Sequence, residues 1–153
     1  MEQAPQKRIV VATDGSAGAA LAVEEGVWLA KMLDAQVLFL AVVRSPFAFL
    51  GDPYYQRALT DELMKARSAV AAAIPFAEER HVAYETEVVQ GTPADAILQL
   101  ARDRNADLIV VGSRGRGVLG SVSTAVVHHA DRPVLVARAG ARARAEATLR
   151  AAV

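Results

Sequence analysis

The chain has 153 residues, of which 53% are hydrophobic and 22% charged, so it can form one globular domain and is too apolar to be disordered. Its 17 basic residues balance its 17 acidic ones, which gives no electrostatic reason to expect a nucleic-acid partner. It has no cysteine, which excludes disulfides and thiolate chemistry. No apolar stretch reaches bilayer-spanning length and the first residues lack a signal-peptide core, so we expect a cytoplasmic protein without a membrane partner.

The first half of the chain alternates short apolar strands with helices. Residues 9–13 are a β-branched apolar strand, and Ser16 is placed to cap the helix that follows. A second strand, residues 36–43, is apolar on both faces, and an aromatic-rich loop follows at 45–55. In the next helix, Pro75 predicts a kink or an early end, because proline lacks an N–H and clashes with the preceding turn. The first helix has a predicted apolar stripe of Ala20, Val23, Val27 and Ala30.

The second half continues the alternation. Residues 82–89 alternate apolar and polar side chains, as in a partly exposed edge strand. Thr92 suits the cap of the next helix, and Pro93 suits its first position. The remaining elements are a buried strand, a helix and a final strand that begins with proline, as edge strands can, at residues 108–111, 121–130 and 133–137.

This order of elements predicts an α/β fold with a single doubly wound, five-stranded parallel sheet and helices on both faces. The first and fourth strands are the most apolar and should be central, whereas the third and fifth should be edges, which gives the order 3-2-1-4-5. We expect the domain to span residues 1–140, with a flexible or frayed helical tail at 141–153. Ligands of such sheets bind at the carboxyl ends of the strands beside the switch point, here between strands one and four.

Two loops should meet at that crevice, one beginning at Thr13 and one that is rich in glycine and runs from Gly112 to Ser121. Glycines let the backbone approach an anion, and the helix that follows offers free N–H groups. Asp14 can either form a turn or accept a hydrogen bond from a ribose or base. Arginines in the glycine loop can pair with phosphates, although a solvated loop face is the commoner role, and helix capping is the expected role of the nearby hydroxyls; these residues are Arg114, Arg116, Ser16, Ser121 and Ser123.

Three other patterns are weaker indications of a functional site. Gly115-x-Gly117-x-x-Gly120 matches a dinucleotide fingerprint, but no acidic strand end follows to hold a ribose, and no Gly-Lys-Ser/Thr is present. His128 and His129 are adjacent on a helix and therefore point in different directions, which does not suit a shared metal. The aromatic loop could cover a bound base, but packing against its own helix or a partner chain is the preferred interpretation.

Four segments in the right order resemble the universal stress protein family over nearly the whole chain, at residues 9–16, 87–97, 106–117 and 120–136. The resemblance implies the same five-stranded fold, a homodimer built through the last strand and ATP bound at the crevice, with Mg²⁺ or Mn²⁺ carried on the phosphates. The dimer would involve Val134, Leu135 and Val136. Adenosine would contact Ala12, Thr13 and Asp14, and adenine the backbone of Val42. The pocket would be completed by Val111, Gly112 and Gly115, and by Gly120, Ser121, Val122 and Ser123 at the phosphates.

One feature departs from the family pattern. ATP-binding members carry Gly-x2-Gly-x9-Gly-Ser/Thr, whereas here only four residues separate Gly115 from Gly120. The loss of five residues shortens the reach of the loop by up to about 17 Å of extended chain. Two hypotheses follow: a stress-response regulator that binds ATP with slow or no hydrolysis, or a nucleotide-free dimeric interaction module. A nucleotide-dependent enzyme would need a Ser-Gly-Gly or histidine signature at the first turn, which Thr13 to Ser16 lacks.

Overall fold

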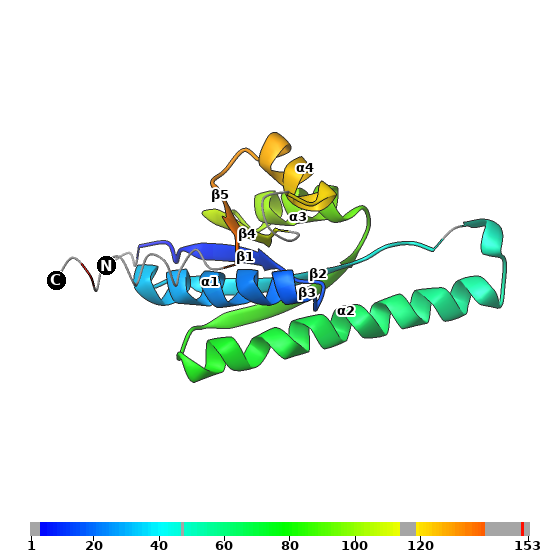
Figure 1. The fold of residues 1–153 in the computed structure, drawn as a ribbon, viewed down its shortest axis with the longest axis horizontal. Coiled ribbons are helices and arrows are strands. Elements are labelled where there is room, and N and C mark those ends of the chain that lie inside the picture. The colour runs from blue at the N-terminus through cyan, green and yellow to red at the C-terminus, as the bar shows by residue number, and fades with distance from the viewer. Residues whose placement is uncertain (1–3, 47, 114–118, 140–150, 152–153) are drawn as a thin grey trace.

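Five parallel strands form one sheet with two helices on each face (Figure 1). This computed structural model describes residues 4–46, 48–113, 119–139 and 151. The strand order β3-β2-β1-β4-β5 confirms the predicted order and fold class. The strands are β1 (Arg8–Ala12), β2 (Gln36–Val43), β3 (Tyr84–Gln90), β4 (Leu108–Gly112) and β5 (Val134–Ala137). The helices are α1 (Ala17–Leu33), the 3-10 turn η1 (Ala48–Leu50), α2 (Tyr54–Glu79), α3 (Pro93–Asp103) and α4 (Ser121–His129).

Two apolar layers enclose the sheet. Val11 and Phe39 are fully buried on the face covered by α1 and α2, and Val10, Leu40 and Ile109 on the face covered by α3 and α4. Because β1 and β4 are buried on both faces, they read as uninterrupted apolar runs, which is why they could be placed at the centre. The predicted tail at 141–153 lies outside the described residues except for residue 151, so the domain boundary stays a prediction.

Helix α1 begins as predicted. The Ser16 hydroxyl accepts a hydrogen bond from the backbone N–H of Ala19 at 3.2 Å, so Ser16 caps the helix. Asp34, in the left-handed conformation, ends it. The predicted apolar stripe is right at three positions and wrong at Ala20, which is exposed, because the buried stripe steps from Val23 back to Ala19.

Helix α2 corrects one prediction: it continues through Pro75 to Glu79 instead of ending early. Pro75 is exposed, and Ala71, whose carbonyl loses its usual donor, is exposed as well, so water can replace the missing hydrogen bond. Ala73 and Ala77 are buried against the sheet on either side of the proline. Packing therefore holds the last turns in place.

Helix α3 shows a second difference. Thr92 occupies the cap position, but its side chain makes no capping hydrogen bond. Pro93 at the first position and Asp95 in the first turn are as predicted. The start of this helix therefore depends on the proline and the helix dipole, without a hydroxyl cap.

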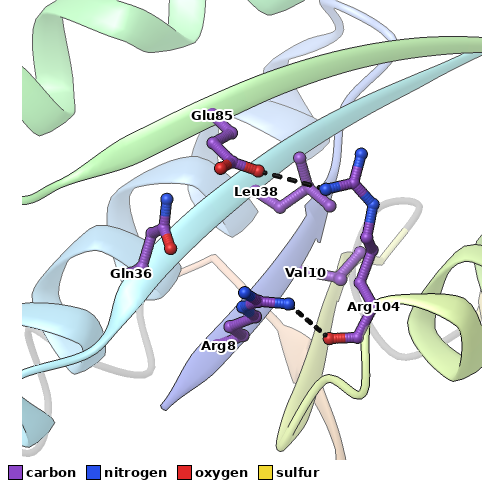
Figure 2. A pocket seen from close by; sticks show the side chains of 6 residues that line it. All are labelled: Arg8, Val10, Gln36, Leu38, Glu85 and Arg104. Carbon is purple, nitrogen blue, oxygen red and sulfur yellow. Dashed lines mark hydrogen bonds and ion pairs between the residues drawn. The ribbon is translucent and has the colours of Figure 1, made fainter. Parts of the chain in front are cut away.

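The amino-terminal ends of the strands are closed by arginines. Figure 2 shows Arg8 donating to the carbonyl of Arg104 at 3.0 Å, and Arg104 pairing with Glu85 of β3 at 3.3 Å. Arg104 also pairs with Glu87 at 2.7 Å, and the backbone N–H of Arg8 donates to the Asp107 carboxylate at 2.9 Å. The space left among these side chains has a volume of about 10 Å³, roughly that of one water molecule.

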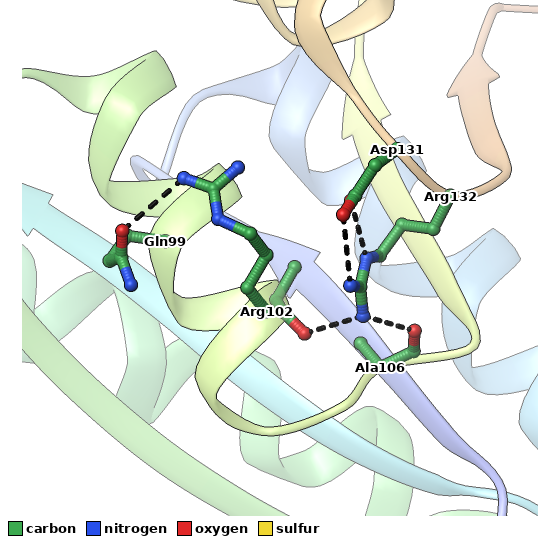
Figure 3. Close-up of polar contacts among 6 residues, drawn as sticks. Gln99, Arg102, Ala106, Asp131 and Arg132 are labelled. Atoms are coloured by element: carbon green, nitrogen blue, oxygen red, sulfur yellow. Dashed lines mark hydrogen bonds and ion pairs between the residues drawn. The ribbon is translucent and has the colours of Figure 1, made fainter.

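A third arginine, Arg132, stabilises the same end of the sheet. Figure 3 shows the Arg132 guanidinium donating to the carbonyl of Ala106 and to the Asp131 carboxylate. Its donor nitrogen lies 2.8 Å from the carbonyl oxygen of Ala106 and 2.7 Å from that of Ala101, which accepts a further hydrogen bond. The Arg132 side chain is only 15% exposed. It therefore satisfies carbonyls at the end of α3 and in the turn that leads into β4.

Candidate functional site

A pocket of about 690 Å³ opens at the carboxyl ends of β1, β2 and β4. The starts of α1, α3 and α4 and one residue of α2 complete its wall. Of the eleven crevice residues predicted from the sequence, Gly115 lies outside the described residues and the other ten line this pocket: Ala12, Thr13, Asp14, Val42, Val111, Gly112, Gly120, Ser121, Val122 and Ser123. The predicted switch point thus coincides with the large cavity.

The apolar part of the pocket lies on one face of the sheet. Leu40 and Val42 of β2 belong to the layer between the sheet and α3–α4, together with Val111 of β4 and Ile97 of α3. Ala12 of β1 packs against the same layer. A flat apolar ligand group placed here would rest on side chains that the core already holds in position.

The turn after β1 is held by local hydrogen bonds. The Thr13 N–H donates to the carbonyl of Leu40 at 2.8 Å, and its hydroxyl accepts from the N–H of Gly15 at 3.2 Å. The Asp14 carboxylate accepts from the N–H of Ser16 at 2.9 Å, so Asp14 has the turn-forming role. Its side chain also lines the pocket, so the same residue faces any bound ligand.

Two glycines bring the first turn of α1 onto the end of β4. A Cβ on Gly112 would lie 2.4 Å from the carbonyl oxygen of Gly18, and one on Gly18 would lie 2.8 Å from that of Ser113. No side chain fits between the two backbones. This contact keeps the two predicted loops together, and neither glycine had been assigned it from the sequence.

The start of α4 presents backbone N–H groups that have no acceptor within the helix. Gly120 caps the helix without a side-chain hydrogen bond, and the first backbone bond within the helix is from Thr124 to Gly120. The N–H groups of Ser121, Val122 and Ser123 precede that bond, at the positive end of the helix dipole. The expected capping role is wrong at Ser121, which is the first residue of the helix after the Gly120 cap. It is also wrong at Ser123, whose buried hydroxyl donates to the carbonyl of Gly112 at 2.7 Å and ties α4 to β4.

Other lining residues went unrecognised in the sequence. Three charged side chains line the described part of the pocket, and two of them, Arg44 and Glu62, come from the region between β2 and α2. Arg44 could have been found by continuing the alternation of β2 past Val42, whereas Glu62 lies on a helix with no local signal. Ser113 also lines the pocket, where its hydroxyl donates to the carbonyl of Ala137 at 3.1 Å.

The remaining predicted motifs lie elsewhere. The rings of His128 and His129 are 6.5 Å apart, and among the described residues no three His, Cys, Asp or Glu side chains gather as a metal site would require. Phe49 of the aromatic loop is 84% exposed and does not line the pocket. Arg114 and Arg116 lie outside the described residues.

Comparison with known proteins decides the family. The model of the Universal stress protein family matches residues 6–138. The chain belongs to this family. A universal stress protein of Methanocaldococcus jannaschii is 38% identical over 141 residues, which cover 86% of this chain and 82% of that protein. Among the described helices, none has the length and apolarity needed to cross a bilayer.

Solved structures of other universal stress proteins share the fold. One from Lactobacillus plantarum is 30% identical and superposes with a TM-score of 0.77, covering 89% of this chain and all of that one. A universal stress protein in complex with cAMP is 28% identical, with a TM-score of 0.70 and coverage of 88% and 99%. An Arabidopsis thaliana family member with AMP bound is 25% identical, with a TM-score of 0.67 and coverage of 89% and 94%.

Proposed function

We propose that this universal stress protein binds an adenine nucleotide in the pocket between β1 and β4. The observation that carries the proposal is that ten residues expected at a nucleotide line one cavity of about 690 Å³, a size typical of small-molecule sites. The solved structures of family members in complex with cAMP and with AMP support the ligand class.

The pocket has chemically different ends, which orients the ligand. Val42 lies on β2 and the start of α4 follows β4, so the two ends are separated by two strand spacings, about 9.6 Å. The base would lie on the apolar side chains near Val42, the ribose near Asp14, and the phosphates at the N–H groups of Ser121 to Ser123.

ATP is the specific nucleotide we propose, with Mg²⁺ or Mn²⁺ carried by its phosphates. No lysine or histidine lines the described part of the pocket. We therefore expect slow hydrolysis or none, and a protein that acts by holding the nucleotide.

A second candidate rests on the glycine loop, whose sequence is five residues shorter than the ATP-binding pattern. Fewer backbone amides are then available for phosphates, and the chain would act as a nucleotide-free dimeric interaction module. In either case, family membership supports a stress-response regulator in the cytoplasm, which a stress-survival assay of a strain lacking the gene and cell fractionation would test.

Calorimetry with ATP, AMP and cAMP, with and without Mg²⁺, separates the two candidates. A specific ligand at a hundredfold excess over its Kd should stabilise the fold by about 2.7 kcal/mol. Ser121→Glu should abolish binding, because it places a negative charge at the phosphates. The helix itself should tolerate the change, because an acidic residue is favourable in the first turn. Ser121→Gln is the neutral control of matched size. No binding to wild type at millimolar nucleotide would favour the nucleotide-free module.

The homodimer is a further part of the proposal. β5 lies at the edge of the sheet, and Val134, Leu135 and Val136 are half-buried. The carbonyls of Pro133 and Ala137 accept hydrogen bonds from Ile109 of β4 and from Ser113 just after it. By alternation, the backbone groups of Val134 and Val136 therefore face outward. Exposed strand edges of this kind readily pair with another chain.

Val136→Pro tests this interface, because it removes one outward N–H without removing a bond to β4. We expect light scattering to show a dimer for wild type and a monomer for the variant, with both folded by circular dichroism. A wild-type monomer at micromolar concentration, or a variant that stays dimeric, would contradict pairing through β5.

A further inference from the structure

We propose that Arg44 covers the nucleobase and stacks its guanidinium on the ring, so that it determines how tightly the base end of the pocket binds. This inference rests on the proposed nucleotide function and deepens it. It assigns to Arg44 a role that is separate from phosphate binding.

The strand register places Arg44 beyond the point at which β1 ends. Ala12, the last residue of β1, pairs with Leu40 of β2, but β2 continues for three more residues to Val43. Arg44 therefore lies four residues beyond Leu40, which is level with the end of β1, and about 13 Å further along the strand direction. It stands at the rim on the β2 side.

Alternation along β2 gives the face. Leu40 and Val42 belong to the layer on the α3–α4 side, whereas Ala41 and Val43 belong to the layer on the other side. Arg44 continues the series of Leu40 and Val42, and it lines the same pocket. A planar base resting on the two apolar side chains would thus lie on the same strand face as Arg44, whose long side chain can extend back over the ring.

Arg44 differs from the arginines that brace the fold. Arg104 pairs with two glutamates, and Arg132 donates to two backbone carbonyls. Arg44 makes no side-chain hydrogen bond or ion pair with any residue in the described part of the chain, and Glu62, the other charge at this rim, pairs with Lys65 at 3.1 Å. The guanidinium of Arg44 is thus available to a ligand.

The chemistry of the surroundings favours a base over a phosphate as the partner. A guanidinium is planar and stacks on aromatic faces, a contact that the compact ammonium of lysine reproduces poorly. Apolar side chains of Leu40, Val42 and Ile97 form the nearby wall. The donors suited to phosphates lie at the start of α4, on the far side of β1.

The test compares AMP with adenosine, which has the base and ribose but no phosphate. Calorimetry measures AMP, and NMR titration measures adenosine into the millimolar range. Arg44→Ala should weaken both ligands by the same factor, roughly 3- to 30-fold, and Arg44→Lys should recover little of the loss. Arg57→Ala is the matched control, since this exposed arginine of α2 does not line the pocket.

The outcomes separate the inference from the proposed function. If wild type does not bind AMP, ATP or cAMP, the proposed function fails and the inference with it. If wild type binds AMP but Arg44→Ala weakens only AMP and not adenosine, or if Arg44→Lys binds like wild type, the arginine acts through charge and stacking is wrong. Unchanged affinity in Arg44→Ala, or no measurable binding of adenosine to wild type, also overturns the inference.

Discussion

The two ends of the sheet differ in how they use the same five strands. At the amino-terminal ends, the side chains of Arg8, Arg104 and Arg132 donate hydrogen bonds to carbonyls and carboxylates, and the space left between side chains is about that of one water molecule. At the carboxyl ends, the strands stop at different heights and leave a pocket of about 690 Å³. One end is closed by long charged side chains, and the other is kept open by glycines and short residues.

This difference is consistent with the proposed function, in which the fold is stabilised at one end of the strands and the ligand binds at the other. The arginines at the closed end donate to carbonyls that would otherwise lack a partner, and the fold requires such groups to be satisfied. The open end leaves the first N–H groups of α4 without intrahelical acceptors, so that a ligand or water can accept from them. Substitutions at the closed end should therefore lower stability, and substitutions at the open end should also affect ligand binding.

The largest effect should come from the glycine contact beside the pocket. We expect Gly112→Ala to lower the free energy of unfolding by about 3 kcal/mol, because its Cβ would lie 2.4 Å from a backbone oxygen of Gly18 that cannot rotate away. Urea denaturation measures the stability, and calorimetry should show weaker nucleotide binding in the same variant.

A double-mutant cycle with Gly18→Ala serves as the control for that prediction. Both methyl groups strain the same contact, so the double variant should lose less stability than the sum of the two single losses. Additive losses would mean that the two glycines do not act on one contact, and a stable Gly112→Ala protein would show that α1 can move away from β4 at little cost.

At the closed end of the sheet, Arg132→Ala should lower the free energy of unfolding by about 2 kcal/mol, because the carbonyls of Ala101 and Ala106 lose a charged donor. Nucleotide affinity should stay unchanged. Arg102→Ala is the matched control, since Arg102 makes one side-chain hydrogen bond, to Gln99 at 3.3 Å (Figure 3). An Arg132→Ala protein that is fully stable but binds nucleotide poorly would contradict the view that the closed end serves stability and the open end ligand binding.

The smallest effect is a titration. The hydrogen bond from Arg132, opposed by desolvation, holds the pKa of the Asp131 carboxyl below its ordinary value of 3.8. A lowered pKa in the folded state stabilises the fold above the ordinary value, and this contribution is lost as the pH falls through the lowered pKa. NMR of the Asp131 carboxyl should show a midpoint below 3.8 in wild type and a higher one in Arg132→Ala. Equal midpoints would mean that the pair does not form in solution.

Much of the fold could be predicted because its signals are local. The uninterrupted apolar runs of β1 and β4, the Ser16 cap and the alternation of β3 follow from neighbouring residues. The errors arose where tertiary packing overrode local preference, as in α2, where buried alanines hold the helix through Pro75. Contacts between distant segments, such as Arg132 with the end of α3, have no local signature.

The site was predictable to the same extent. Residues at the ends of β1, β4 and β2 could be placed in one crevice because the topology brings those ends together. The contact between Gly18 and Gly112 joins residues 94 positions apart and depends on backbone distance, which composition does not encode. Glu62 reaches the pocket only because α2 lies along the sheet.

The uneven heights of the strands have a consequence for how this scaffold can diversify. Leu40 is fully buried and Ala12 packs against the same apolar layer, so the surface beneath a bound ligand tolerates few replacements. At Arg44 the chain has left the packed interior, so a replacement there alters what contacts the ligand without disturbing the side chains that support it. Because β2 extends beyond β1, substitutions at the rim of the pocket can change its ligand preference while the core stays the same.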